Sequence, residues 1–271
     1  MAKKHLSAQN VEKGKKPGLL RRSLAILGPG LITGAADDDP SGISTYSVAG
    51  AAYGYATLWI ALLTFPLMVA VQLMCARLGM VTGRGLAAAV RIYYPRWVLW
   101  GACSILVVAN VINIGADLGG MAEATQLITG VRALIWIPVY ACFIIGLLIW
   151  ISYKLMAQIF KWMTLVLFAY VFASFYAHVD WRHALAMTFV PHLEWSRGFL
   201  AVLVAILGTT ISPYLFFWQA AEEVEEGRIK GRGLADRKNA TAADLRSARA
   251  DTMVGMFFSN LIMYFIILTT A

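Results

Sequence analysis

The chain alternates between long uncharged apolar stretches and short segments that hold nearly all of its charged residues. A bilayer core about 30 Å thick needs about 20 apolar residues in an α-helix, and stretches of that length recur along the sequence. The pattern therefore predicts an all-α integral membrane protein. It has a basic tail at 1–22, a transmembrane domain over 23–271 and a polar loop at 223–250. The seven predicted spans lie at 24–53, 57–79, 97–120, 133–153, 156–178, 198–222 and 251–271.

The first span is predicted to be broken. Its apolar run 24–36 reaches only about 20 Å as a helix, at about 1.5 Å per residue, before Asp37, Asp38 and Asp39. Pro40, which lacks a backbone N–H, follows these acids and favours an unwound turn. Irregular backbone at this depth is tolerated only where it is buried in protein or lines a cavity, so its oxygens outline a cation site. The alternative is a water-filled vestibule or partial protonation of the acids.

The sixth span carries a matching interruption, Gly208-Thr209-Thr210-Ile211-Ser212-Pro213-Tyr214. A mid-span proline frees backbone groups, and the neighbouring hydroxyls bond that backbone or line a pocket. A single proline is more often a simple kink. Two interrupted spans five helices apart, however, are the pattern of a transporter whose site lies between inverted repeats. Asp117, late in the third span, adds a carboxylate that is a candidate for proton or ion passage.

The basic residues predict the orientation of the chain. There are 23 Lys and Arg residues against 15 Asp and Glu, and in the seven-span arrangement all bases except Arg132, Arg182 and Arg197 fall on one side. Bases concentrate in cytoplasmic segments, so the amino terminus is predicted to be cytoplasmic, in a multi-pass protein of the cell (inner) membrane. The surplus is thus an orientation signal rather than a nucleic-acid footprint. The segment 180–197 is predicted to be an external loop.

The composition and the cysteine positions exclude several classes of protein and of functional site. With 59% hydrophobic and 14% charged residues, a water-facing globule is a poor fit. Cys75, Cys103 and Cys142 lie inside apolar runs and offer neither a disulfide framework nor a paired metal motif. No nucleophile and base pair or cofactor fingerprint stands out, so neither an enzyme nor a cofactor is expected.

Four short motifs carry a family resemblance. They are Gly28-Pro29-Gly30, Asp39-Pro40-Ser41-Gly42, Ala116-Asp117-Leu118 and Gly208-Thr209-Thr210-Ile211-Ser212-Pro213. They resemble motifs of the NRAMP (natural resistance-associated macrophage protein) family of proton-coupled divalent metal transporters. The resemblance implies a LeuT-type inverted-repeat transporter fold: the first repeat plus two helices of the second, with discontinuous helices 1 and 6.

The resemblance also implies roles for single residues. Asp39 corresponds to the family's metal carboxylate, and the Ala36 and Thr209 carbonyls to its backbone ligands. Ser212 and Gly42 stand where the family has side-chain ligands, and Asp117 belongs to a proton route. The other candidates for a proton or ion pathway are Asp37, Asp38, Tyr214 and Gln219.

Several positions depart from the family pattern. The family's DPGN reads Asp-Pro-Ser-Gly, so Gly42 has no side-chain amide, and its MPH reads Ser212-Pro213-Tyr214, without thioether or histidine. Gln219 replaces a second histidine, and Gly120 stands where a glutamate is expected. An all-oxygen site suits harder ions such as Mg²⁺ and weakens selection for Mn²⁺ or Fe²⁺. Without those acidic and histidine groups, a passive or differently coupled uniport stays open beside proton coupling.

The leading hypothesis is a divalent metal cation transporter of the Mg²⁺, Mn²⁺ or Fe²⁺ class. Its expected partners are the metal ion, protons if transport is coupled, and the lipid bilayer, but no nucleic acid. One alternative is a non-transporting membrane sensor or interaction protein. Another is an inactive truncated fragment, because the implied fold needs ten core helices. An amino-acid transporter is weaker, since the acidic break repels a substrate carboxylate. Oligomeric state and transport direction stay open.

Overall fold

The computed structural model describes residues 33–34, 36–151, 155, 159, 162–163, 165–229 and 240–271, and the regular structure of that part of the chain is helical. The predicted tail 1–22 and the Gly28-Pro29-Gly30 motif lie outside the described residues. So do most of 24–36, the first part of the predicted span 156–178, and residues 230–239 of the predicted loop.

The elements follow one another in a simple order. They are α3 (Pro40–Tyr53), η1 (Gly54–Thr57), α4 (Trp59–Thr82), α5 (Leu86–Tyr93), α6 (Arg96–Thr129), α7 (Ala133–Trp150), α9 (Phe168–Tyr176), α10 (Trp181–Phe189), α11 (Arg197–Thr210), α12 (Pro213–Ile229) and α13 (Ala242–Thr270).

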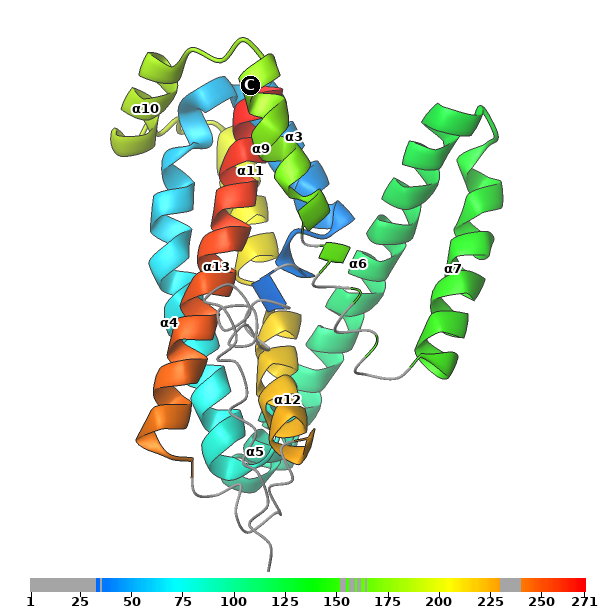
Figure 1. The fold of residues 1–271 in the computed structure, drawn as a ribbon, viewed down its shortest axis with the longest axis vertical. Helices are drawn as coiled ribbons and strands as arrows, with labels where there is room; N and C mark the ends of the chain where they lie inside the picture. Colours follow the sequence, from blue (N-terminus) through cyan, green and yellow to red (C-terminus); the bar gives the residue numbers. More distant parts are fainter. Residues whose placement is uncertain are drawn as a thin grey trace, which may run out of the picture.

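Helix α13 runs through the middle of the main bundle, among α3, α4, α9 and the α11–α12 pair (Figure 1). Its apolar side chains Met256, Ile262, Met263 and Ile266 are completely buried. A helix that is apolar on most of its surface suits such an enclosed position. The discontinuous segments therefore lie against a central helix that comes from the far end of the chain.

Small residues allow the backbones in this bundle to come close together. A β-carbon at Gly34 would overlap the backbone of Gly255, and one at Gly50 would overlap the Ile267 carbonyl in α13. Helices in membranes associate through close packing at small residues, because lipid provides no hydrophobic drive between them. The glycines are thus part of what brings the first broken segment against α13.

Helices α6 and α7 form an antiparallel hairpin beside the bundle (Figure 1). Large apolar side chains project from it into the surroundings, including Ile112 at 67% and Leu148 at 62% exposure. Such a surface is unsuited to water and suits lipid or other apolar helices. Within the hairpin, the hydroxyls of Thr125 and Tyr140 are hydrogen-bonded.

Five helices among the described residues are long and apolar enough to cross a membrane. They are Trp59–Thr82, Arg96–Thr129, Ala133–Trp150, the α11–α12 pair Arg197–Arg228, and Ala242–Thr270. The first predicted span is represented by the 14 residues of α3, and the fifth by the nine residues of α9, because each adjoins residues outside the description. The seven-span arrangement accordingly stays a prediction.

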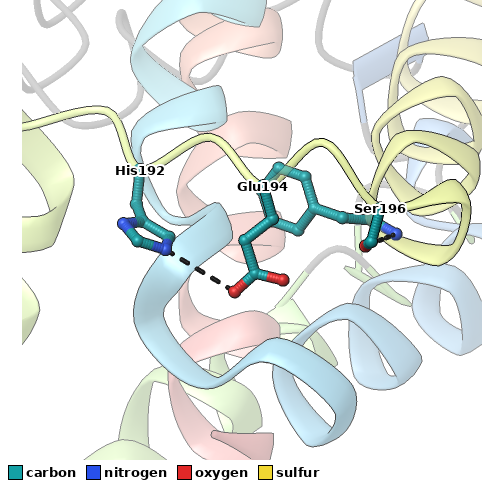
Figure 2. A network of polar contacts seen from close by, with 4 residues as sticks. His192, Glu194 and Ser196 are labelled. Atoms are coloured by element: carbon teal, nitrogen blue, oxygen red, sulfur yellow. Dashed lines mark hydrogen bonds and ion pairs between the residues drawn. The ribbon is translucent and has the colours of Figure 1, made fainter.

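The connection predicted as a loop at 180–197 contains a helix that the sequence reading missed. The Asp180 carboxylate begins α10 by accepting the backbone N–H groups of Arg182 and His183. Irregular chain follows, in which His192 and Glu194 lie 3.5 Å apart as an ion pair when the histidine is protonated (Figure 2). Ser196 then begins α11 by accepting the Phe199 N–H.

The predicted polar loop at 223–250 is also partly helical. Helix α12 continues to Ile229, and α13 already begins at Ala242. The early start of α13 has a local cause: Thr241 and Asp244 each bond the other's backbone N–H in a capping box. This box starts the helix well before the apolar stretch that sequence reasoning used to place it.

Candidate metal site

Asp39 stands at the break in the first discontinuous helix. Its backbone is extended, with φ −73° and ψ 168°, and α3 begins with the next residue, Pro40. The Oδ1 atom accepts the Gly42 N–H and the Ser41 hydroxyl, both at 2.7 Å. An acid that caps a helix in this way is held at the positive end of the helix dipole. The sequence thus fixes this carboxylate locally, with Oδ2 left for other partners.

The second discontinuous helix supplies the partner of Oδ2. The Tyr214 hydroxyl, in the first turn of α12, lies 3.1 Å from Asp39 Oδ2 and 3.3 Å from the Ala36 carbonyl oxygen. Its single hydrogen is shared between these two acceptors. The structure therefore joins three predicted site residues: Ala36 and Asp39 from the first break, and Tyr214 from the second.

The second break lies between the end of α11 at Thr210 and the start of α12 at Pro213. The Ser212 hydroxyl turns back to the carbonyls of Gly208, at 2.9 Å, and Thr209. Both residues expected as ligands here, Thr209 and Ser212, are thus bonded to each other. Carbonyls freed by the proline are satisfied by a local hydroxyl, as expected for such breaks in membrane helices.

Asp117 approaches the first break from α6. Its Oδ1 accepts the backbone N–H of Ser41 at 3.1 Å, one residue into α3. Gly120, one turn further along α6, lies against Pro40, where an added β-carbon would be 3.3 Å from the proline side chain. The missing glutamate at position 120 thus has a packing counterpart: a small residue lets α6 come close to the start of α3.

Asp37 and Asp38 are both buried in the bundle. Their exposed fractions are 1% and 4%. The Asp37 Oδ2 atom accepts the hydroxyl of Ser259, in α13, at 2.5 Å. These two acids therefore occupy surroundings different from those of the half-buried Asp39.

Gln219 is fully buried one to two turns below the break, and its Nε2 donates to Glu223 Oε1 at 3.1 Å. Its side-chain amide thus bonds within α12 rather than to Asp39. Sequence reasoning also missed two site residues. In the sequence Ser41 stands out only as part of the motif Asp39-Pro40-Ser41-Gly42, although it contacts both Asp39 and Asp117, and Ser259 carries no sequence signal of its own.

The donor set around Asp39 consists of oxygens. Among the described residues, no group of three or more His, Cys, Asp and Glu side chains is arranged to hold a metal ion. What lies at the breaks is one carboxylate with carbonyls and hydroxyls, from Ala36, Thr209, Ser212 and Tyr214. Oxygen donors of this kind are typical of sites for hard cations such as Mg²⁺.

Comparison with known proteins gives a consistent result. The sequence profile described as "Natural resistance-associated macrophage protein-like" matches residues 30–271. A divalent metal cation transporter MntH of Caldanaerobacter subterraneus subsp. tengcongensis is 27% identical over 249 residues, which are 88% of this chain and 55% of that protein. A protein of the same name from Erwinia tasmaniensis is 30% identical over 250 residues, covering 88% of this chain and 57% of that one. The chain spans about half the length of the curated relatives it matches.

Solved structures show the same fold. A mutant of the Eremococcus coleocola manganese transporter superposes with a TM-score of 0.76 at 21% identity, covering 96% of this chain and 54% of that one. The same transporter with a bound aromatic bis-isothiourea compound gives a TM-score of 0.73 at 20% identity. At these identities the likeness concerns the fold alone: the LeuT-type arrangement of helices, of which the chain covers about half.

Proposed function

The chain belongs to the natural resistance-associated macrophage protein-like family, and from this premise we propose that the protein carries a divalent metal cation across a membrane, with Asp39 as its carboxylate ligand. One observation carries the proposal. The Asp39 carboxylate lies between two discontinuous helices, with one oxygen bonded at the start of α3 and the other facing the start of α12. Relatives of this chain are named divalent metal cation transporters.

The remaining ligands in this proposal are backbone and hydroxyl oxygens. The carbonyls of Ala36 and Thr209 and the hydroxyl of Ser212 complete the coordination, with Gly42 keeping Asp39 in place through its N–H. For an ion to reach both Asp39 Oδ2 and the Ala36 carbonyl, the Tyr214 hydroxyl must release the hydrogen bonds that now join them. The phenol then turns its lone pairs, rather than its hydrogen, toward the ion.

The other acids belong to a pathway in this proposal. Asp117 is bonded to the start of α3 through the Ser41 N–H and is a candidate for passing a proton or ion. Asp37, Asp38, Tyr214 and Gln219 are further candidates on the same route. We propose that coupling to protons, if present, passes through Asp117, since it is the carboxylate that contacts the α3 start from another helix.

Uptake into liposomes tests the function. The whole protein, reconstituted in liposomes with a Mg²⁺-sensitive or Mn²⁺-sensitive dye inside, is expected to give saturable uptake of the ion above protein-free liposomes. Uptake should increase with protein density and decrease when the other divalent ion competes. Dye signals that match those of protein-free liposomes for both ions would reject the proposed transport.

The substitution Ser212→Met tests whether the absence of a thioether ligand favours Mg²⁺ over Mn²⁺. The change adds the soft thioether that this chain lacks, so the ratio of Mn²⁺ to Mg²⁺ uptake is expected to rise about tenfold, or about 1.4 kcal/mol. Because Ser212 is buried, Ser212→Leu serves as a control for added bulk without sulfur. An equal change of the ratio in both variants would show that volume, and not sulfur, sets the preference.

We further propose that the amino terminus is cytoplasmic in the inner membrane, so that Glu194 faces outward and Ser247 inward. Both positions are exposed, and the three native cysteines can be replaced by alanine as a background. A membrane-impermeant maleimide should label Glu194→Cys in intact cells and Ser247→Cys only after permeabilisation. The reverse order of labelling would overturn this orientation.

A second candidate function is a non-transporting membrane protein that keeps the fold. The observation in its favour is the Tyr214 hydroxyl, which stands between the two oxygens expected to hold the metal. Calorimetry with Mg²⁺ and Mn²⁺ discriminates between the two candidates. Heat changes no larger than those of buffer would favour the second function, whereas saturable binding together with uptake would exclude it.

A further inference from the structure

A second set of buried oxygens lies just before Asp39 in the chain. Both carboxylate oxygens of Asp38 and the Oδ1 atom of Asp37 are buried, and no hydrogen bond from the described residues reaches them. A buried carboxylate without donors loses its hydration and gains nothing in return. Three such oxygens in consecutive residues therefore require a positive partner or the loss of their charge.

The Tyr46 hydroxyl of α3 adds a further oxygen to this set. Tyr46 is fully buried, and its ring lies beside Asp37: a β-carbon added at Gly42 would stand 3.0 Å from the Asp37 carbonyl oxygen and 3.5 Å from the Tyr46 ring. The Tyr46 hydroxyl lies 3.2 Å from the Thr210 hydroxyl of α11, which donates its own hydrogen to the Ile206 carbonyl at 2.6 Å. The hydrogen between the two hydroxyls therefore comes from Tyr46, which leaves the lone pairs of its oxygen for the carboxylates' side.

Ser259 closes the set from α13. Its hydroxyl hydrogen is directed to Asp37 Oδ2, so its oxygen also keeps lone pairs free for another partner. The close approach of Gly34 to Gly255 brings the segment before Asp37 against α13 one turn from Ser259. Helices α3 and α13 thus each provide a hydroxyl oxygen whose hydrogen is already donated, from Tyr46 to Thr210 and from Ser259 to Asp37 Oδ2.

We propose that Asp37 and Asp38, with the hydroxyl oxygens of Tyr46 and Ser259, bind a second divalent cation, separate from the ion at Asp39. Oxygen donors alone select a hard cation, and two carboxylates match a charge of two. The site goes beyond the proposed transport function, since it needs neither Asp39 nor Tyr214. Its ion neutralises the acids that precede the break and holds that segment to α13.

Counting bound ions tests the proposal. The whole protein in nanodiscs is equilibrated with Mg²⁺ alone, and bound ion is measured by equilibrium dialysis. Two ions per chain are expected for the unaltered protein, and one for Asp38→Asn. Asp180→Asn is the matched control. Asn at position 180 caps α10 as well as Asp does, and this position is exposed, away from the proposed ion. This variant should keep two ions.

Ser259→Ala keeps the test valid if Asp38→Asn alters folding. It removes one hydroxyl, and the affinity of the second ion is expected to fall about tenfold or more, by analogy with the loss of a supporting partner at other metal sites. One ion per chain in the unaltered protein, unchanged by Asp38→Asn and Ser259→Ala, would overturn the inference. Its failure is distinct from that of the proposed function: Asp39→Asn removes the other ion and leaves the Asp38-dependent one.

Discussion

Replacing Asp39 with alanine is expected to reduce metal uptake at least about 100-fold. Partners that merely support a metal ligand are worth about 10- to 100-fold in affinity, and in the proposed function Asp39 is the ligand itself. The change also removes the cap that holds the Ser41 hydroxyl and the Gly42 N–H. Initial rates of Mg²⁺ and Mn²⁺ entry into liposomes, measured at equal protein density, provide the test.

Asp39→Asn separates the two roles of the carboxylate. Asparagine caps a helix about as well as aspartate, so α3 should keep its start while the charge that attracts the ion is lost. Uptake is expected to be lost in both variants, whereas a loss of thermal stability is expected only with alanine. Transport by Asp39→Asn at the rate of the unaltered protein would remove this residue from the proposed metal site, whatever ion was used.

Replacing Gly79 with alanine is expected to destabilise the protein by about 1–3 kcal/mol, the usual cost of overpacking. A β-carbon at this position of α4 would stand 2.5 Å from the backbone oxygen of Ala220 in α12. Since the obstacle is backbone rather than a flexible side chain, the two helices must move apart. The apparent melting temperature in detergent, followed by helical circular dichroism, should therefore decrease.

Gly101 provides the matched control for this prediction. It lies in α6 with open space where a β-carbon would be added, so Gly101→Ala gains the helix propensity of alanine without overlap. The two substitutions are thus expected to shift the melting temperature in opposite directions. A decrease of equal size in both variants would point to a general effect of glycine replacement and contradict the packing explanation.

The breaks at Asp39 and Pro213 were predictable because their causes are local. A proline after an acid, or after hydroxyl residues, ends a helix through backbone chemistry that a single stretch of sequence contains. The contacts across the breaks are harder to predict from the sequence. Tyr214 was suspected only as a pathway residue, and its bond to Asp39 depends on how two distant helices are placed in space.

Ser259 shows most clearly what the sequence alone does not predict. It bonds Asp37 across 222 positions of sequence, and a serine in an apolar span has many ordinary uses. The helices α5 and α10 were missed for a different reason. They are short and connect longer helices, so the length criterion that finds spans passes over them. The start of α10 depends on the Asp180 cap, whereas α5 begins after Gly85 without a side-chain cap.

Ser41 connects the two acids at the break. Its hydroxyl is bonded to Asp39 and its backbone N–H to Asp117, so one residue is fastened to two carboxylates from different helices. Because the same residue is bonded to the α3 cap and to α6, an ion bound at Asp39 in the proposed transport would be linked to the α6–α7 hairpin through Ser41.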